Sequence, residues 1–276
     1  MGLCTVTRLK GYAQTSSPAP KSGPENYDSL VSQLLFFPDK YPTGNWTPHD
    51  LHFQDVWFKA DDGSRLHGWL CKANPERAMI FFAHGNGGNI ATRVPWLTYL
   101  QTRLKVSVFT FDYRGYGRSE GTPTVDGVIQ DARAAWQTLR DISGNDTNVF
   151  LMGESLGGAV VVQLAAATPP RGLILQSTFT SLRDMASVHY PLLSAIVPTN
   201  TLNSSSQMPS IHCPLLQSHG TIDQVIPFAD GTNLFALANE PKEFIRLDQV
   251  GHNNWMTSEY LRRLDLFITK VTSTNR

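Results

Sequence analysis

The chain has 276 residues, of which 41% are hydrophobic, and 23 Lys and Arg residues balance 23 Asp and Glu residues. This length and composition can bury the core of one α/β domain. A formal charge of zero gives no electrostatic basis for binding nucleic acid or an anionic membrane, so we expect no nucleic-acid partner. The three cysteines form no C-x-x-C pair and the histidines lack metal-ligand spacing. We therefore expect no disulfide framework, no metal and no cofactor.

The N-terminal part of the chain carries no hydrophobic signal core, and no stretch is long enough to span a bilayer. We therefore expect a cytoplasmic protein without a transmembrane segment, although a processed exported form or a lipid-anchored form stays open. Residues 11–26 are rich in Pro, Ser and Gly. This composition predicts a flexible lead over residues 1–28 and one domain over residues 29–276. The apolar residues 34–37 are interpreted equally well as a strap against that domain or as a core strand.

Strand and helix patterns alternate from residue 52 onwards. Two strands flank Asp61-Asp62-Gly63, which is a hairpin turn signal. The further predicted strands are residues 78–84, which are continuously apolar through residue 83, 106–113, 149–152, 172–178, 213–219 and 242–248. Helical patterns lie between them, among them residues 91–104, 159–167 and a last helix from about residue 258. Apolar strands that alternate with helices predict a mostly parallel sheet covered by helices on both faces.

The stretch from residue 149 to 167 organises the chain. Four apolar residues predict a buried strand, an apolar helix follows, and Gly153-Glu154-Ser155-Leu156-Gly157 lies between them. A strand that becomes a helix within five residues turns sharply, and the residue at the apex is forced into a strained conformation. Ser155 occupies that apex, above the unpaired N–H groups of a helix N-terminus. This context predicts that Ser155 is a nucleophile.

A second segment, residues 117–121, has the same G-x-S-x-G spacing around Ser119. Thr122-Pro123 follows it in place of an apolar helix, so the strand–turn–helix context is missing. We interpret Ser119 as a solvated serine in a glycine-rich loop.

Polar residues follow nearly every predicted strand, at the edge where open parallel sheets bind ligands. A serine nucleophile needs a base, and the base needs a carboxylate that fixes its tautomer. His252 follows the last strand and is the predicted base, and Asp223 follows the strand over residues 213–219 and is the predicted acid. The competing groups, interpreted as structural or surface side chains, are His84, His219, Asp230 and Asp248.

Acyl transfer also needs N–H donors for a tetrahedral oxyanion. The N–H of Leu156 and the N–H of Asn86, in the loop over residues 84–89, are the predicted pair. The residues predicted to contact substrate are Gly85, Gly87, Tyr116, Glu154, Thr178, Phe179 and Tyr190. Residues 180–211 separate two sheet strands, and we expect them to form a short, partly helical lid over an acyl or alcohol pocket. The alternative, a long crossover without substrate contact, stays open.

These motifs resemble those of the α/β-hydrolase superfamily over roughly residues 52–270. The matching segments are residues 84–89, 112–117, 153–157, 220–227 and 251–252. The chain is similar to small single-domain serine esterases related to the eukaryotic protein depalmitoylases. Superfamily members with an aspartate nucleophile, such as dehalogenases and epoxide hydrolases, are disfavoured by Ser155.

The resemblance implies an α/β-hydrolase fold and a serine esterase. Such an enzyme cleaves small carboxylic esters of short to medium acyl chain through an acyl-enzyme intermediate and a Ser-Asp-His triad. The alternatives are an acyl-protein or acyl thioesterase, an amidase or peptidase, and a binding protein without catalysis. The oligomeric state is not predicted.

Overall fold

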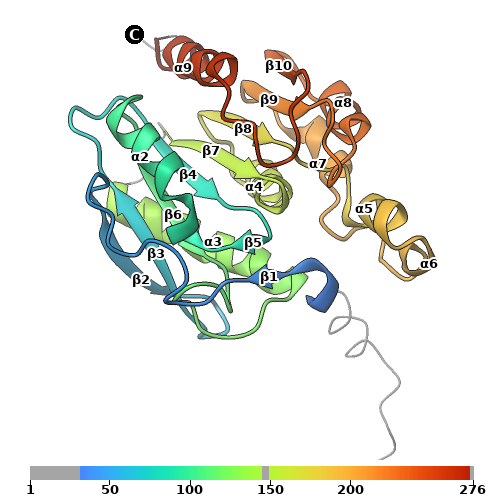
Figure 1. Cartoon of the computed structure of the whole chain (residues 1–276), viewed down its shortest axis with the longest axis horizontal. Coiled ribbons are helices and arrows are strands. Elements are labelled where there is room, and N and C mark those ends of the chain that lie inside the picture. Colours follow the sequence, from blue (N-terminus) through green and yellow to red (C-terminus); the bar gives the residue numbers. More distant parts are fainter. Residues whose placement is uncertain (1–31, 145–148, 274–276) are drawn as a thin grey trace, which may run out of the picture.

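An eight-stranded sheet forms the centre of the computed structural model, which describes residues 32–144 and 149–273 (Figure 1). The strand order is β10-β9-β8-β7-β4-β6-β3-β2. The β2–β3 and β3–β6 pairs are antiparallel, and every other neighbouring pair in this sheet is parallel. The predicted α/β-hydrolase fold with a mostly parallel sheet is confirmed. The predicted lead over residues 1–28 lies outside the described residues.

The strands of this sheet follow the apolar segments closely. They are β2 (Gln54–Lys59), β3 (Arg65–Cys71), β4 (Met79–Ala83), β6 (Ser107–Asp112), β7 (Val149–Glu154), β8 (Gly172–Gln176), β9 (Leu215–Gly220) and β10 (Lys242–Leu247). The longer helices are α2 (Val94–Thr102), α3 (Val125–Ser143), α4 (Leu156–Ala167), α5 (Leu182–His189), α8 (Phe228–Ala236) and α9 (Ser258–Ser273). The predicted helix over residues 91–104 begins instead as the 3-10 turn η1 (Ile90–Arg93) and continues as α2, with Pro95 in its first turn.

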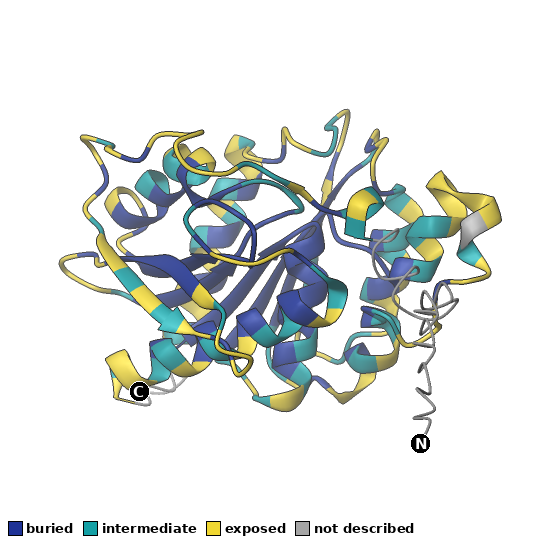
Figure 2. Ribbon diagram, turned by 90° about the horizontal axis from the view of Figure 1, so that it is seen from below, coloured by how far each residue is buried: buried dark blue, intermediate teal, exposed yellow. Residues whose placement is uncertain are grey.

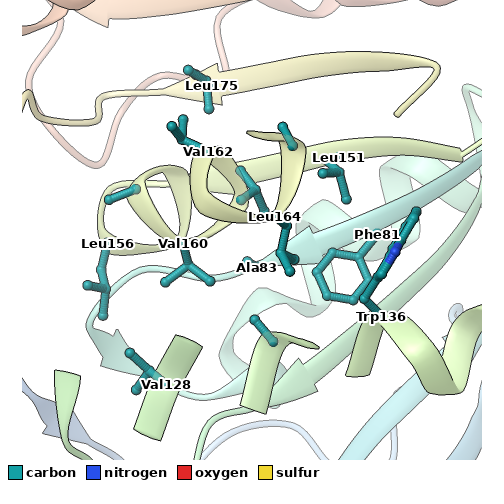
Figure 3. Close-up of a cluster of buried hydrophobic side chains, with 14 of the residues drawn as sticks. Phe81, Ala83, Val128, Trp136, Leu151, Leu156, Val160, Val162, Leu164 and Leu175 are labelled. Atoms are coloured by element: carbon teal, nitrogen blue, oxygen red, sulfur yellow. The ribbon is translucent and has the colours of Figure 1, made fainter. Parts of the chain in front are cut away.

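Helices cover both faces of the sheet. Successive side chains of a strand point to opposite faces, so neighbouring residues of one strand pack against different helices. Phe81 of β4 packs in the cluster that contains α3, α4 and α8. Its neighbours Ile80 and Phe82 pack in the second cluster with α2 and α9. Figure 2 shows the strands buried between the two helix layers. Figure 3 shows α4 packed through Val160 and Leu164 beside Phe81 and Trp136.

The segment before the hairpin is a strap and not a strand of the core. Phe37 and Pro38 form the short strand β1, which pairs in parallel with β5 (Gly87–Gly88) in a separate two-stranded sheet. The Phe37 N–H donates to the Asn86 carbonyl at 3.0 Å and the Asp39 N–H donates to the Gly88 carbonyl at 3.1 Å. Of the two interpretations that the sequence left open, the structure therefore selects the strap.

The segment between β8 and β9 is partly helical. It contains α5, the one-turn helices α6 (Pro191–Ser194) and α7 (Ser204–Gln207), and the 3-10 turn η2 (Met208–Ser210). Ser181 caps α5, because its Oγ accepts from the Asp184 N–H at 3.1 Å. Figure 1 shows α5 and α6 at the periphery of the molecule, near β1. Across the described parts of the chain, no helix combines the length and the apolar character needed to cross a bilayer.

Candidate active site

Ser155 lies at a strained turn between β7 and α4. Its φ is 54° and its ψ is −117°, a combination that a residue with a Cβ rarely adopts. The turn is held on both sides: the Ser155 N–H donates to the Gln176 carbonyl at 2.9 Å, and the Thr178 hydroxyl donates to the Ser155 carbonyl at 2.8 Å. The Ser155 hydroxyl makes no capping hydrogen bond with α4, every residue of which is described. The fold therefore supports the backbone of this serine and leaves its hydroxyl available.

Glycines allow α4 to lie directly against the sheet at this turn. A Cβ at Gly157 would collide with the carbonyl of Ala83 in β4, which is backbone and cannot move aside. We expect Gly157→Ala to lower the free energy of unfolding by about 3 kcal/mol or more. The substitution would otherwise favour the helix, because alanine has the higher helix propensity. Urea unfolding measures the effect.

The matched control for this prediction is Gly251→Ala. No atom outside its chain neighbours lies within 4 Å of a Cβ at Gly251, and its backbone is not left-handed. An equal loss of stability in the two variants would contradict the packing argument.

The loops after β9 and β10 bring a carboxylate and an imidazole together. His252 Nδ1 lies 2.7 Å from Asp223 Oδ2. The other carboxylate oxygen of Asp223 accepts from the N–H groups of Val225 and Ile226, both at 2.9 Å. Burial raises the pKa of Asp223, but hydrogen bonds from His219, His252 and the Ile226 N–H outweigh it and hold the pKa below its usual range. An ionised Asp223 favours the His252 tautomer that carries its proton on Nδ1, which leaves Nε2 free to accept one.

Ser155, Asp223 and His252 each follow the carboxyl end of a parallel strand and therefore lie at one edge of the sheet. Ser155 is almost buried, with 6% of its surface exposed, and the His252 side chain is 11% exposed. Within residues 32–144 and 149–273, no hydrogen bond joins the Ser155 hydroxyl to His252. The Asp–His contact is thus formed, and the Ser–His contact stays a prediction. Catalytic hydrogen bonds are often long in structures without substrate.

The two competing histidines make structural contacts in the structure. His84 is fully buried, its Nδ1 lies 2.7 Å from the Gly85 carbonyl, and its ring packs against Tyr113 and Tyr116. His219 is also fully buried, and its Nε2 lies 2.9 Å from the Ile226 carbonyl. His219 therefore shapes the loop that presents the predicted acid.

The two predicted oxyanion donors come from different elements. Leu156 is the first residue of α4, and the first N–H groups of a helix have no acceptor within it. Asn86 is fixed by the strap and by the loop after β6. Its carbonyl accepts from the Tyr116 hydroxyl at 2.7 Å and from the Phe37 N–H at 3.0 Å, and its side chain donates to the Leu35 carbonyl at 2.8 Å. A backbone held at three points can present an N–H in a fixed direction.

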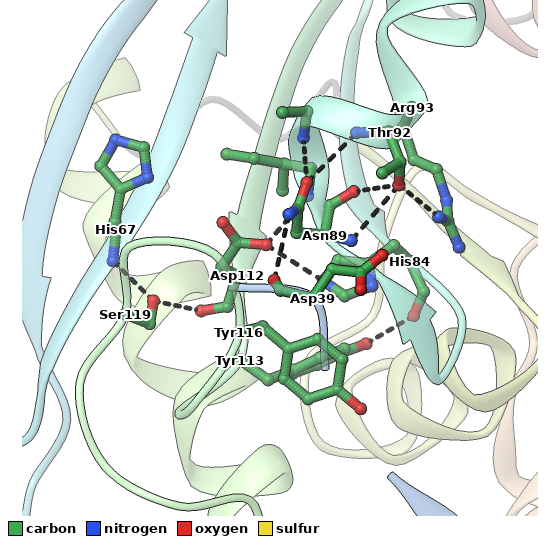
Figure 4. Close-up of polar contacts among 12 residues, drawn as sticks. Asp39, His67, His84, Asn89, Thr92, Arg93, Asp112, Tyr113, Tyr116 and Ser119 are labelled. Atoms are coloured by element: carbon green, nitrogen blue, oxygen red, sulfur yellow. Dashed lines mark hydrogen bonds and ion pairs between the residues drawn. The ribbon is translucent and has the colours of Figure 1, made fainter. Parts of the chain in front are cut away.

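A network of buried polar side chains, which includes Asp112 and Ser119, lies next to this loop (Figure 4). Asp112 is fully buried and accepts from the Ile90 N–H at 2.9 Å. The Ser119 hydroxyl donates to the Asp112 carbonyl at 2.7 Å and accepts from the His67 N–H at 3.0 Å. The interpretation of Ser119 as solvated is wrong. Ser119 is only 5% exposed, and its hydroxyl links His67 of β3 to Asp112 of β6. Because the Ser119 hydroxyl makes these two buried hydrogen bonds, it is held by the fold and is not positioned to act as a nucleophile.

An ion pair beside Ser155 has no counterpart in the sequence predictions. Arg93, at the end of η1, approaches Glu154 with Nη2 3.4 Å from Oε1 and Nε 3.4 Å from Oε2. A Cβ at Gly85 would lie within 3.4–3.6 Å of Glu154 Oε1, Ser155 Cβ and Arg93 Nη2. The pair therefore lies at the same loop as Ser155. The helical pattern of residues 91–104 gave no signal that Arg93 turns toward the strand ends.

An apolar cavity of about 240 Å³ lies between the strap and residues 182–197, which belong to the segment predicted to form a lid. The residues that line it are Leu34, Leu35, Phe37, Asn86, Leu182, Met185, Ala186, His189, Tyr190, Ile196, Val197 and Val225. The presence of Asn86 connects the cavity to the predicted oxyanion loop. The sequence could not show this cavity, because two segments about 150 residues apart form its walls.

The residues predicted to contact substrate are distributed around this loop. Tyr190 lines the cavity. Tyr116 and Thr178 are fully buried and their hydroxyls bond to backbone carbonyls of the site, which gives them a supporting role. Phe179 is 3% exposed and packs in the core, and Gly87 belongs to β5. Substrate contact by these residues, and by Gly85 and Glu154, stays a prediction.

The described residues contain no group of three or more His, Cys, Asp or Glu side chains that could hold a metal ion. Cys71 and Cys213 are free thiols, and burial raises the pKa of each to about 12. Both thiols therefore stay protonated at neutral pH and are poor nucleophiles. Cys4 lies outside the described residues.

Comparison with known proteins places the chain in a family. Residues 74–208 match the family described as serine aminopeptidase, S33. The uncharacterized protein YfhR of Salmonella typhi is 32% identical over 249 residues, which cover 84% of this chain and 84% of that protein. The chain belongs to the serine aminopeptidase S33 family of α/β hydrolases. The match to the S33 family contains Asn86 and Ser155 and ends before Asp223 and His252.

Other relatives and solved structures agree with the S33 family and its fold. An uncharacterized protein of Mycobacterium tuberculosis is 36% identical over 234 residues, which cover 82% of each chain. The α/β hydrolase domain-containing protein WAV2 of Arabidopsis thaliana is 43% identical over 149 residues, 52% of this chain and 48% of that protein. An esterase of Pyrococcus furiosus superposes with a TM-score of 0.73 at 21% identity, over 86% of this chain and 98% of its own. The relation to depalmitoylases stays a prediction.

Proposed function

We propose that the chain is a serine hydrolase that cleaves carboxylic esters of short to medium acyl chain through an acyl-enzyme. Ser155 is the nucleophile, His252 the base and Asp223 the acid of this proposal. The observation that carries it is the 2.7 Å contact between His252 and Asp223, at the end of the sheet where the strained Ser155 directly follows β7. Membership of a hydrolase family and the esterase fold of the solved neighbours support it.

In the first half of the reaction, Ser155 Oγ attacks the ester carbonyl and its proton passes to His252 Nε2. Asp223 stabilises the imidazolium that forms. The carbonyl oxygen becomes an oxyanion and accepts from the N–H groups of Leu156 and Asn86, each worth about 3–4 kcal/mol of transition-state stabilisation. The tetrahedral intermediate then collapses: the C–O bond to the alcohol breaks, and His252 donates its proton to the departing oxygen.

In the second half, water attacks the acyl-enzyme. His252 takes a proton from the water, the same two N–H groups stabilise the second oxyanion, and collapse breaks the bond to Ser155 Oγ. The acid product leaves, and the hydroxyl regains its proton from His252. A thioester would follow the same steps with a thiol as leaving group.

The apolar cavity is the proposed acyl pocket. Its volume of about 240 Å³ lies below the range of about 300–1,000 Å³ that drug-sized ligands occupy, which favours a short or medium acyl chain. Ala186 of α5 lines it. We expect Ala186→Phe to lower kcat/KM for a p-nitrophenyl octanoate by about tenfold or more, while kcat/KM for the acetate changes little, because the added ring takes up cavity volume that the longer acyl chain needs and the acetyl group does not.

Ala195→Phe is the matched control, because Ala195 is an exposed residue of the same segment that does not line the cavity. Its chain-length profile should equal that of the unmodified chain. If Ala186→Phe changes kcat/KM by the same factor for the acetate and the octanoate, this cavity is not the acyl pocket.

An amidase or peptidase is the second candidate, because the matched family is described as serine aminopeptidase. Recognition of a free α-amino group requires a carboxylate beside the nucleophile. Glu154 has this position, but its carboxylate faces the Arg93 guanidinium, which competes for the same charge. A panel of acyl esters, acyl thioesters and aminoacyl amides with matched acyl groups discriminates the candidates. Turnover of the amides alone would overturn the esterase proposal.

A further inference from the structure

Residues 185–222 contain no Asp, Glu, Lys or Arg, although these types make up 17% of the chain. The segment runs from α5 through α6, α7 and η2 to the end of β9. Part of it lies in the interior, where uncharged residues are ordinary. The α5–α6 part lies at the periphery of the molecule (Figure 1), where charged residues are the usual composition.

The apolar side chains of α5 and α6 are exposed. Leu192, in the α6 turn, is 94% exposed, Ile196 is 52% exposed, and Val188 and Tyr190 are also exposed. Phe37 of the strap and Val225 of the acid loop add to this group from neighbouring elements. We call these six residues the apolar rim. In Figure 2, the peripheral helical turns of this segment are coloured yellow, as exposed. Contiguous exposed apolar side chains mark an interaction surface.

The apolar rim surrounds the mouth of the cavity. Phe37, Tyr190, Ile196 and Val225 both line the cavity and are exposed. Leu192 and Val188 are exposed beside them without lining it. The surface that would contact a partner is thus continuous with the space that would receive an acyl chain.

We propose that the apolar rim docks on a lipid surface and that a single acyl chain passes from the lipid into the cavity. A protein partner would be selected and oriented through complementary charges, and residues 185–222 offer no charged group for this. A lipid surface requires only that apolar side chains enter the acyl region. The formal charge of zero means that this docking does not depend on anionic lipid. Docking rests on the rim alone; only the passage of the acyl chain rests on the proposed function.

The test is sedimentation of the full chain with vesicles of phosphatidylcholine. We expect binding that changes little when anionic lipid is added or when salt is raised, since the contact is apolar. Leu192→Glu and Val188→Glu should each weaken binding by about tenfold, the cost of placing a charge where an apolar side chain was buried in lipid. Leu266→Glu is the matched control: Leu266 is 53% exposed on α9, against the other face of the sheet, and its variant should bind like the unmodified chain.

Hydrolysis of a soluble p-nitrophenyl acetate separates the two proposals. We expect the Leu192→Glu and Val188→Glu variants to keep this activity, since neither residue lines the cavity, and to lose activity on an acyl ester presented in vesicles. Absence of vesicle binding by the unmodified chain, or equal binding by all variants, would overturn the docking surface. Self-association that Leu192→Glu abolishes, without vesicle binding, would overturn it in favour of a second copy of the chain.

Discussion

Ser155→Ala is expected to abolish covalent labelling by a fluorophosphonate and to lower kcat by about four orders of magnitude or more. The reason is that the Ser155 hydroxyl is both the atom that bonds to the probe and the proposed nucleophile, and no neighbouring group can replace it. The methyl group of alanine fits the same strained turn, so circular dichroism should report a folded protein. Gel fluorescence after labelling measures the first effect and ester hydrolysis the second.

The chain supplies its own control in Ser119, which lies in a second G-x-S-x-G segment. Ser119→Ala removes two buried hydrogen bonds, to the Asp112 carbonyl and from the His67 N–H. We expect it to lower the free energy of unfolding by about 1–3 kcal/mol and to leave labelling intact. Labelling that persists in Ser155→Ala and disappears in a folded Ser119→Ala would identify Ser119, and not Ser155, as the nucleophile. Absence of labelling in the unmodified chain would favour the binding-protein alternative.

Asp223→Asn is expected to lower kcat by about 10³–10⁴-fold with little change in fold, as the same change does in the serine protease triad. A neutral amide can place its NH₂ against His252 Nδ1 and so select the tautomer that carries the proton on Nε2. That tautomer cannot accept the proton of Ser155. Single-turnover hydrolysis of a p-nitrophenyl ester measures the loss in the acylation step.

Asp230→Asn is the matched control, since Asp230 is the next aspartate along the same loop and helix. Asp230 accepts from the Thr180 hydroxyl at 3.1 Å, and burial raises its pKa, so a neutral amide is a small change there. We expect activity within a few-fold of the unmodified chain. A large loss in Asp230→Asn together with a small loss in Asp223→Asn would reassign the acid.

The acid limb of the pH profile follows from the same contacts. Hydrogen bonds hold the pKa of Asp223 below its usual range, so this carboxyl stays ionised while pH falls through the working range of the base. The acid limb of kcat/KM should therefore have unit slope, because the Asp223 carboxyl does not take up a second proton in this range. A slope of two would show that the carboxyl titrates with the imidazole.

The sheet and its order of strands and helices could be predicted because they depend on local patterns. Buried parallel strands are rich in apolar residues, and β4 shows this over its whole length. The positions of Asp223 and His252 followed from topology, because the carboxyl ends of parallel strands share one edge. Their 2.7 Å contact agrees with that argument.

What could not be predicted depends on contacts between distant segments. Ser119 was placed in solvent because its loop is rich in glycine, whereas the loop folds back onto β3 and bonds to His67, 52 residues away. The ion pair of Arg93 with Glu154 joins residues 61 apart, and a charged residue in a helical pattern carries no sign of its partner. The cavity and the pairing of β1 with β5 have the same cause, since both need the strap to reach the loop after β4.

The strap has a consequence for where this domain can be divided. The match to the family begins at residue 74, and the hairpin and sheet begin at residue 54, so a boundary drawn at either place discards residues 34–39. A fragment that begins at residue 54 keeps every strand of the main sheet and the Asp223–His252 contact, whereas one that begins at residue 74 also loses β2 and β3. Both fragments lose the hydrogen bond to the Asn86 carbonyl and one wall of the cavity. We therefore expect proteolytic trimming just before residue 54 to leave a fragment that folds but has lower turnover by the proposed mechanism.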